Sequence, residues 1–216
     1  MIEPTRVFLL RHGQTAWNAE RRLQGQLDVP LDAVGQRQAA QMATSLAGEE
    51  LAAIYSSDLQ RAHATALALA RVTGLPVIQD KALRERGFGR LEGLTYAEVE
   101  ELWPDDALRW RLREPDFGPG GGETLRVFYQ RSVSAVTRLA LPHPGQVIAV
   151  VAHGGVLDCL YRSATGLDLG APRTWQLGNA TVNRLLFTGE HFVVVGWDDR
   201  AHLDAAMPTP MLTPTP

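Results

Sequence analysis

The chain has 216 residues and lacks the features of several protein classes. It holds one cysteine, Cys159, so no disulfide can form within the chain, and this sparse use of cysteine fits a reducing compartment. No apolar run approaches the ~20 residues of a membrane-spanning helix, and residues 1–6 lack the pattern of a signal peptide. These absences predict a cytoplasmic protein without a membrane partner.

An excess of basic residues is also missing. The 24 acidic and 21 basic residues are interspersed and give a net charge of −3, so the chain has no basic stripe that would bind nucleic acid. The six histidines show no HExxH or other zinc spacing, and we expect neither a metal nor another cofactor. The expected partner is a small molecule.

Strand-like and helix-like patterns alternate along the chain. The length favours one domain, which we assign to residues 1–203, followed by a Pro- and Thr-rich tail (204–216) that we predict to be disordered. This alternation predicts an α/β fold whose largely parallel sheet is covered on both faces. Strands are expected at 6–10, 51–57, 75–78 and 147–152, helices at 31–46, 58–72, 124–141 and 155–164, and an antiparallel hairpin from 181–187 and 192–197.

Local signals set several of these boundaries. Asp32 and Asp58 are predicted to cap the helices that follow them, and Gly74 to end the second. Residues 96–113 read as helical with an interruption at Trp103-Pro104, and 115–122 as a Gly- and Pro-rich loop that covers a site. We expect Trp103 and Trp110 to pack against the fold, with a lid over the pocket as the alternative.

Two histidines directly follow predicted strands, His12 in Arg11-His12-Gly13 and His153 in His153-Gly154-Gly155. Because ligands of open α/β sheets bind beyond the carboxyl ends of the strands, these residues should meet at one edge. Arg61 and Glu85 follow two other predicted strands and join them there.

This set suits phosphoryl transfer, which needs a nucleophile, fixed positive charge and a proton for the leaving oxygen. A neutral imidazole can attack phosphorus, and the forked donors of Arg11 and Arg61 match phosphate oxygens. Glu85 can protonate the leaving oxygen and then take a proton from water. Since arginines supply the positive charge, the scheme requires no metal.

The run Leu10–Asn18 resembles the signature of the histidine phosphatase superfamily, in the branch of cofactor-dependent phosphoglycerate mutases and their phosphatase relatives. Further matches follow in the family's order over nearly the whole chain except its tail. They are Arg22–Gly25, Asp28–Leu31, Gly35, Gln38-Ala39, Tyr55–Ala62, Thr65-Ala66, Leu83–Glu85, Phe88-Gly89, Glu92-Gly93, Gly122–Thr124, Arg131 and His153–Gly155.

The resemblance implies a three-layer α/β/α sandwich and assigns roles to individual residues. It implies that His12 becomes the phosphohistidine and that Glu85 is the proton donor and acceptor. It also implies that the phosphoryl group is held by Arg11, Arg61 and His153. The implied substrate-binding residues are Asn18 as an amide donor, Gln24 and Gly25 at the pocket mouth, and Gly154.

The resemblance leaves three functions to compare. The first is a metal-independent phosphomonoesterase for small phosphorylated metabolites, the second a phosphoglycerate mutase, and the third an inactive binding module. Mutases of this family are longer and carry Gln where this chain has Glu92, which favours the phosphatase, and the intact residue set argues against the third. The motifs do not name the substrate, which residues 96–122 are expected to select. A homodimer through the hairpin edge at 181–197 is an option.

Overall fold

The computed structural model describes residues 3–204 and contains one sheet with the strand order β3-β2-β4-β1-β5-β6. Neighbours among β1 to β4 run parallel, whereas β5 pairs antiparallel with both β1 and β6. The mostly parallel sheet and its carboxyl-terminal hairpin are therefore confirmed. The strands are β1 (Thr5–Arg11), β2 (Leu51–Ser56), β3 (Val77–Gln79), β4 (Val147–Ala152), β5 (Val182–Phe187) and β6 (Phe192–Asp199).

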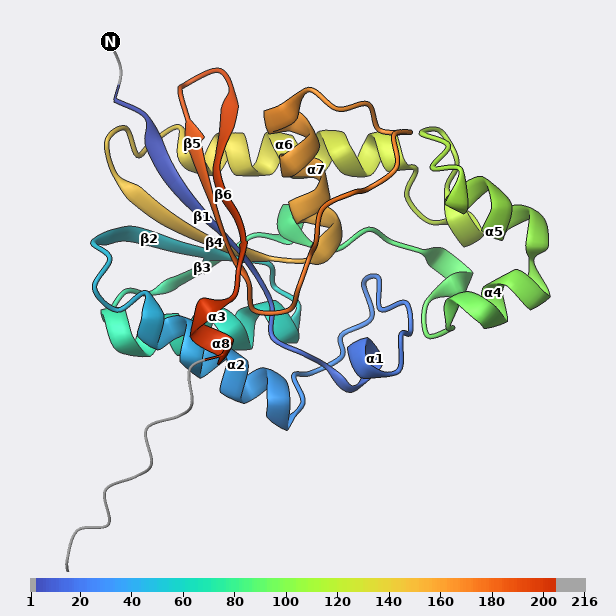
Figure 1. Cartoon of the computed structure of the whole chain (residues 1–216), viewed down its shortest axis with the longest axis horizontal. Helices are drawn as coiled ribbons and strands as arrows, with labels where there is room; N and C mark the ends of the chain where they lie inside the picture. The colour runs from blue at the N-terminus through green and yellow to red at the C-terminus, as the bar shows by residue number, and fades with distance from the viewer. Residues whose placement is uncertain (1–2, 205–216) are drawn as a thin grey trace, which may run out of the picture.

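Helices cover both faces of the sheet (Figure 1). The helices are α1 (Ala16–Ala19), α2 (Ala33–Ser45), α3 (Gln60–Thr73), α4 (Tyr96–Leu102), α5 (Pro104–Arg111), α6 (Leu125–Ala140), α7 (Gly154–Thr165) and α8 (Ala201–Asp204). Short 3-10 turns occupy Lys81–Leu83, Gly89–Leu91 and Pro119–Gly121. Within residues 3–204, no helix is both long and apolar enough to cross a membrane.

Alternating side chains of the central strands divide the core into two layers. In β1, Val7 and Leu9 pack with residues of α6 and α7, whereas Phe8 and Leu10 pack with residues of α2 and α3. β4 is buried at every position and alternates in the same way. Because successive residues of a strand point to opposite faces, an unbroken apolar run is what a sheet covered on both sides requires. The three-layer α/β/α architecture is confirmed.

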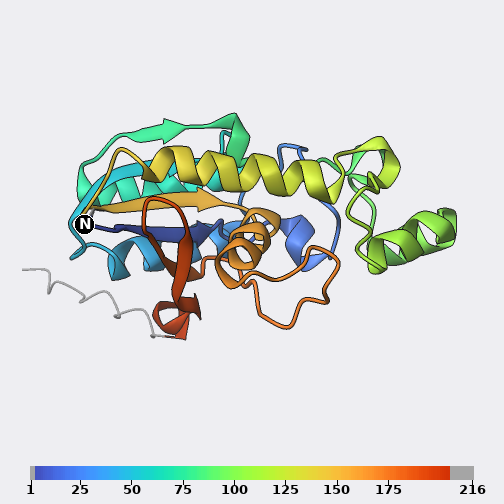
Figure 2. The ribbon, with the colours of Figure 1, turned by 90° about the horizontal axis from the view of Figure 1, so that it is seen from above.

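The carboxyl ends of β1 and β4 point toward the side of the molecule that carries α1 and the α4–α5 pair (Figure 1). Seen from above, α4 and α5 project beyond the end of the sheet (Figure 2). The predicted interruption between them is confirmed, since α4 ends at Leu102 and α5 begins with Pro104. Proline is favoured at a first helical position because it has no N–H to leave unpaired.

The prediction that Asp58 caps α3 is wrong. Its carboxylate instead accepts hydrogen bonds of 2.7 and 2.6 Å from Arg84, and the N-cap position is Leu59, whose side chain makes no capping bond. The first helical amide, Gln60 N–H, donates to Oδ1 of Asp28 at 2.7 Å. A distant residue therefore supplies the cap that sequence rules assign to a neighbour. By contrast, Asp32 caps α2 as predicted.

Other differences concern the ends of elements. The four-residue helix α1 was not predicted; it is closed by a capping box between Thr15 and Asn18. Asp204, assigned to the tail by the sequence, ends α8, and residues 205–216 of the predicted disordered tail lie outside the described residues. β6 is an edge strand, and its pairing with a second copy stays a prediction.

Candidate active site

The ends of β1 and β4 bring the two predicted histidines together. His12 follows β1 directly, and its backbone N–H donates to the carbonyl of Ala152 at the end of β4, at 3.1 Å. His153 comes next in the chain and occupies the N-cap position of α7. The two rings lie 5.2 Å apart between centroids and are tilted by 60°. Parallel neighbours in the sheet thus place both imidazoles at one edge, as predicted.

One ring nitrogen of His12 is hydrogen-bonded to the backbone, and the other has no hydrogen-bond partner within residues 3–204. Nδ1 lies 2.7 Å from the carbonyl oxygen of Gly13, and because a carbonyl only accepts, Nδ1 carries the proton. The lone pair is then on Nε2. Burial holds the pKa of His12 well below its usual value, and the positive charges of Arg61 and Arg11 lower it further. At neutral pH the side chain, only 3% exposed, is a neutral imidazole with a nucleophilic nitrogen.

His153 is fully buried beside His12. Its Nε2 lies 2.9 Å from the hydroxyl oxygen of Ser57, the residue that follows β2, and Nδ1 has no hydrogen-bond partner within residues 3–204. Burial, followed by the charge of Arg61, holds the pKa of His153 well below its usual value. A buried nitrogen without a partner is rare in native proteins, so this ring is arranged to contact a further polar group.

Two arginines bring positive charge to His12. Arg61 is 0% exposed and donates to the carbonyls of Leu27 at 2.8 Å and Gly25 at 2.7 Å. Arg11 donates to the carbonyl of Leu177. Within residues 3–204, the Nε atoms of both are buried without a hydrogen-bond partner, and neither arginine forms an ion pair with a carboxylate. Burial lowers the pKa of each to about 10, so both stay charged at neutral pH.

The carboxylate of Glu85 is held by two backbone amides. The N–H of Arg86 donates to Oε1 at 2.8 Å, and the N–H of Gly155 donates to Oε2 at 3.0 Å. A Cβ atom at position 155 would lie 2.1 Å from Oε1, so only glycine fits there. Arg131 donates to the carbonyl of Glu85 at 3.3 Å and forms an ion pair of 2.6 Å with Glu123.

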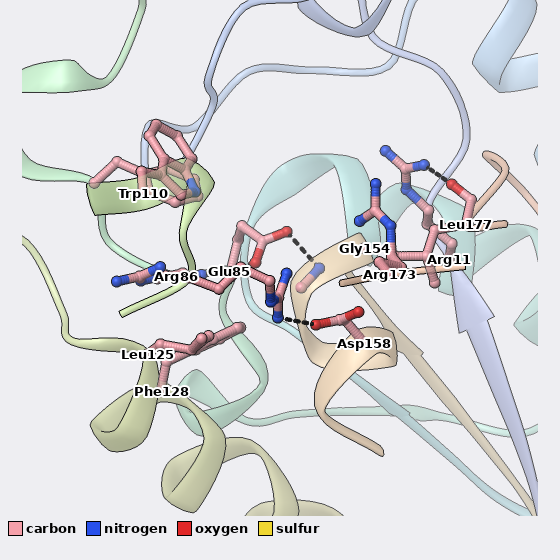
Figure 3. Close-up of a pocket in the computed structure, with 13 residues that line it drawn as sticks. Arg11, Glu85, Arg86, Trp110, Leu125, Phe128, Gly154, Asp158, Arg173 and Leu177 are labelled. Atoms are coloured by element: carbon pink, nitrogen blue, oxygen red, sulfur yellow. Dashed lines mark hydrogen bonds and ion pairs between the residues drawn. The ribbon is translucent and has the colours of Figure 1, made fainter. Parts of the chain in front are cut away.

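Two cavities adjoin at these residues. The smaller, of about 150 Å³, contains Arg11, His12, Arg61 and Glu85 in its wall, together with the predicted substrate contacts Asn18, Gln24 and Gly25. The larger, of about 300 Å³, shares Arg11, Glu85 and Phe88 with it and includes Gly154. In Figure 3 Glu85 lies between Trp110, Leu125 and Phe128 on one side and Arg11 and Arg173 on the other. His153 is not among the residues that line either cavity, but its ring is next to that of His12, which lines the smaller one.

Asn18 and Gln24 each bring an amide to the smaller cavity. The side-chain oxygen of Asn18 accepts from the N–H and hydroxyl of Thr15, both at 3.1 Å, and from the amide of Asn179 at 3.2 Å. Since its oxygen is occupied, Asn18 has its NH₂ group to offer to a ligand. The oxygen of Gln24 is buried and has no partner within the described residues.

Several residues at the site were not predicted. Asn179 donates to the carbonyl of His12 at 3.1 Å and links it to Asn18, and Arg86, Arg113 and Arg173 line the larger cavity. Asn179 could have been found, because β5 runs antiparallel to β1 and therefore begins at the edge where β1 ends. The arginines lie on connections without a periodic pattern, and no sequence signal marks them.

Trp103, Trp110 and Cys159 lie in different environments. Trp103 packs in a small cluster with Leu91 and Val99, as predicted, whereas Trp110 also lines the larger cavity. Cys159 is buried in the core, and burial raises the pKa of its thiol. Among residues 3–204, no three His, Cys, Asp or Glu side chains are grouped so that they could hold a metal ion.

Comparisons with known proteins agree with this geometry. At 38% identity, the chain is similar to a phosphoglycerate mutase-like protein 4 of Arabidopsis thaliana, over 94% of this chain and 89% of the relative. It is also 38% identical to a metal-independent phosphoserine phosphatase of the same plant, over 94% of this chain and 85% of that relative. A solved mycobacterial glucosyl-3-phosphoglycerate phosphatase superposes with a TM-score of 0.81 at 32% identity, covering 92% of this chain and all of the other.

The family model of the histidine phosphatase superfamily (branch 1) matches residues 7–200, which include both histidines, the arginines and Glu85. The match thus covers all of the sheet except the first two residues of β1, and it includes every strand end that contributes to the cavities. The chain is an enzyme of the histidine phosphatase superfamily (branch 1).

Proposed function

We propose that the protein is a metal-independent phosphomonoesterase that hydrolyses small phosphorylated metabolites through a phosphohistidine at His12. One observation carries this proposal. Three buried nitrogens, Nε of Arg11, Nε of Arg61 and Nδ1 of His153, have no partner within residues 3–204 and belong to side chains that surround His12. When the hydroxyl of Ser57 donates to Nε2 of His153, the proton of the neutral ring is on Nδ1. Buried donors are normally paired, and a phosphoryl group bound at His12 offers three oxygens to pair these three.

The first half of the reaction transfers the phosphoryl group to the enzyme. Nε2 of His12 attacks phosphorus, so that an N–P bond forms while the ester O–P bond breaks. Arg11, Arg61 and His153 stabilise the charge on the phosphoryl oxygens, which replaces the need for a cation. In this step Glu85 reacts in its acid form: its carboxyl proton passes to the departing alkoxide and leaves the carboxylate, and Glu85 is in the wall of both cavities.

The second half returns the enzyme to its starting state. Water attacks phosphorus while Glu85 accepts its proton, an O–P bond forms and the N–P bond to His12 breaks. The relatives named phosphoserine phosphatase and glucosyl-3-phosphoglycerate phosphatase support hydrolysis. The relative named phosphoglycerate mutase-like supports the second candidate, in which the phosphoryl group returns to a bound glycerate instead of water.

Hydrolysis of p-nitrophenyl phosphate in the presence of EDTA tests the proposal. We expect turnover with EDTA, and a loss of kcat/KM of roughly 10⁴-fold or more in His12→Ala, because the nucleophile is gone. Rapid acid-free quenching should trap a labelled phosphoryl group on His12. The matched control is His191→Ala on the β5–β6 turn, where the side chain is 83% exposed and far from both cavities. Strict dependence on a metal would overturn the mechanism.

A second assay separates the two candidate reactions. The protein is mixed with 3-phosphoglycerate and a bisphosphoglycerate primer, and 2-phosphoglycerate and inorganic phosphate are measured together. A phosphatase releases inorganic phosphate as the main product. Formation of 2-phosphoglycerate faster than phosphate release would establish the mutase instead.

A further inference from the structure

The ring of His153 has one hydrogen-bond partner within residues 3–204, the hydroxyl group of Ser57. Ser57 follows β2 directly and is 0% exposed, and its Oγ lies 2.9 Å from Nε2 of His153. Because β2 and β4 are parallel neighbours, the backbone N–H of Ser57 donates to the carbonyl of Val151 at 3.0 Å. The sheet therefore holds this serine beside the histidine, and Ser57 is not among the residues that line the two cavities.

The hydroxyl of Ser57 is bonded on both sides. Its oxygen accepts from the backbone N–H of Leu59 at 3.3 Å, which ties the side chain to the segment after β2. Among residues 3–204, Nε2 of His153 is the only acceptor that forms a hydrogen bond with this hydroxyl. Since a hydroxyl has a single proton to give, the arrangement that satisfies it is donation from Ser57 to the lone pair of Nε2.

The direction of this bond decides where the ring carries its own proton. Burial, followed by the charge of Arg61, holds the pKa of His153 well below its usual value, so the ring is neutral and has one proton. With the lone pair on Nε2, that proton is on Nδ1, which is buried without a partner among the described residues. The opposite tautomer would leave the hydroxyl proton of Ser57 without an acceptor and would present a lone pair to the phosphoryl oxygens.

The two imidazoles at the site thus have partners of opposite kinds. The carbonyl of Gly13 accepts from Nδ1 of His12 at 2.7 Å, which leaves an unprotonated Nε2 for attack. The hydroxyl of Ser57 donates to Nε2 of His153, which leaves a protonated Nδ1. Because the ring centroids are 5.2 Å apart, a phosphoryl group on His12 is next to the second ring. One ring is therefore prepared as a nucleophile and the other as a hydrogen-bond donor.

We propose that Ser57 is a positioning residue: its hydroxyl holds the proton of His153 on Nδ1, from which the ring donates to a phosphoryl oxygen. Ser57 does not touch the substrate and acts only through His153. This role rests on the proposed phosphatase function, whereas the position of the proton can be measured without any substrate.

Heteronuclear NMR of isotope-labelled protein measures that position directly, because protonated and unprotonated ring nitrogens of histidine have well-separated chemical shifts. The signals of His153 are identified by their loss in His153→Asn. At neutral pH we expect the wild type to have a protonated Nδ1 and an unprotonated Nε2. In Ser57→Ala the population with the proton on Nε2 should rise, since no donor holds the lone pair there.

Ser56→Ala is the matched control for the loss of a buried hydroxyl. Ser56 is the preceding residue, is also 0% exposed, and donates its hydroxyl to the backbone carbonyl of Ser57 at 2.8 Å. The variant therefore loses a buried hydrogen bond that does not involve the ring of His153. It should keep the wild-type tautomer and most of the wild-type kcat/KM.

A double-mutant cycle tests whether Ser57 acts through His153. Ser57→Ala should lower kcat/KM for p-nitrophenyl phosphate by roughly 10- to 100-fold, the effect of one lost hydrogen bond to a charged group. When His153→Ala is already present, the same change should cost no more than about 2-fold, because the ring that Ser57 orients is gone. The Kd of inorganic phosphate, measured by titration calorimetry, should follow the same pattern.

The proposal is overturned if the wild-type ring of His153 carries its proton on Nε2 or is protonated on both nitrogens. It is also overturned if Ser57→Ala keeps the wild-type tautomer, if its loss is equal with and without His153, or if Ser56→Ala is as damaged. Failure of the phosphatase function looks different. The wild type would then not hydrolyse p-nitrophenyl phosphate, while the tautomer and its dependence on Ser57 would still be observed.

Discussion

At the scale of single residues, the site is defined by burial of charge and of ring nitrogens. Arg11 and Arg61 stay protonated at neutral pH although burial lowers their pKa to about 10, and their charges add to burial in lowering the pKa of His12 and of His153. Burial first, and then these charges, keep both imidazoles neutral, and in the proposed mechanism the same charges bind the phosphoryl group. A neutral imidazole is what nucleophilic attack by His12 requires.

This burial predicts how stability depends on pH. An unfolded histidine titrates near about 6.5, whereas the folded pKa of His153 lies well below that value, so the unfolded state binds more protons as pH falls below about 6.5. Stability should therefore rise with pH up to about 6.5, by at most about 1.4 kcal/mol per pH unit from this residue. Urea unfolding of His153→Asn should show a shallower dependence than wild type below that pH.

His191→Asn serves as the control, because this side chain is 83% exposed. The pH dependence of the stability of this variant should match that of the wild type. Parallel curves for wild type and His153→Asn would contradict the assignment of a neutral, buried His153.

At the scale of elements, a loop rather than a strand holds the guanidinium of Arg61, a proposed phosphate-binding group, in place. Arg61 is bonded to the carbonyls of Gly25 and Leu27, and this loop is itself tied down by Glu92. Oε1 of Glu92 accepts from the N–H of Gln26 at 3.0 Å and from that of Phe88 at 2.9 Å. Glu92 thus links two segments: the loop whose carbonyls accept from Arg61, and the segment that follows Glu85.

Two substitutions of Glu92 separate the effect of its hydrogen bonds from the effect of its negative charge. Glu92→Ala leaves two backbone amides without an acceptor and should lower the free energy of unfolding by about 1–3 kcal/mol, with a higher KM for p-nitrophenyl phosphate. Glu92→Gln keeps one carbonyl oxygen in the same place and should retain most of both properties. Urea unfolding and steady-state kinetics measure the two effects, and a Gln variant as damaged as the Ala variant would contradict this account.

At the scale of the whole molecule, the sheet order places four separate segments around the proposed phosphoryl site at His12. β1, β2 and β4 are neighbours and end at the same edge, and β5 begins there because it runs antiparallel to β1. The resulting cluster of cations is unfavourable without an anion, since buried charges need a partner. Binding of an anion should therefore stabilise the folded protein as a whole.

Inorganic phosphate at 100 times its Kd should add about 2.7 kcal/mol to the unfolding free energy and raise Tm by about 5–10 °C. In Arg61→Gln most of this increase should disappear, because one of the two fixed charges is lost. Thermal unfolding with phosphate is compared with chloride at the same ionic strength. An equal shift in both salts would show that the effect is ionic strength and not a bound anion.

Much of the fold could be predicted because its signals are local. Apolar runs at 6–10 and 147–152 are strands buried on both faces, and their order with the intervening helices fixes a parallel sheet. Boundaries were less predictable where a partner came from elsewhere in the chain. Asp58 satisfies every local rule for a cap, yet Arg84 binds it and Asp28 takes its place.

The sequence by itself determined which chemistry meets at the edge of the sheet, because a residue directly after a strand lies at that edge whatever surrounds it. His12 and His153 were placed in this way, whereas Glu85 follows β3 only after a 3-10 turn. Only the tertiary structure decided what holds and completes the site, including Asn179 and the hydrogen bonds from Glu92 to two loops. Contacts between loops depend on how distant segments pack, and no periodic pattern along the chain records that packing.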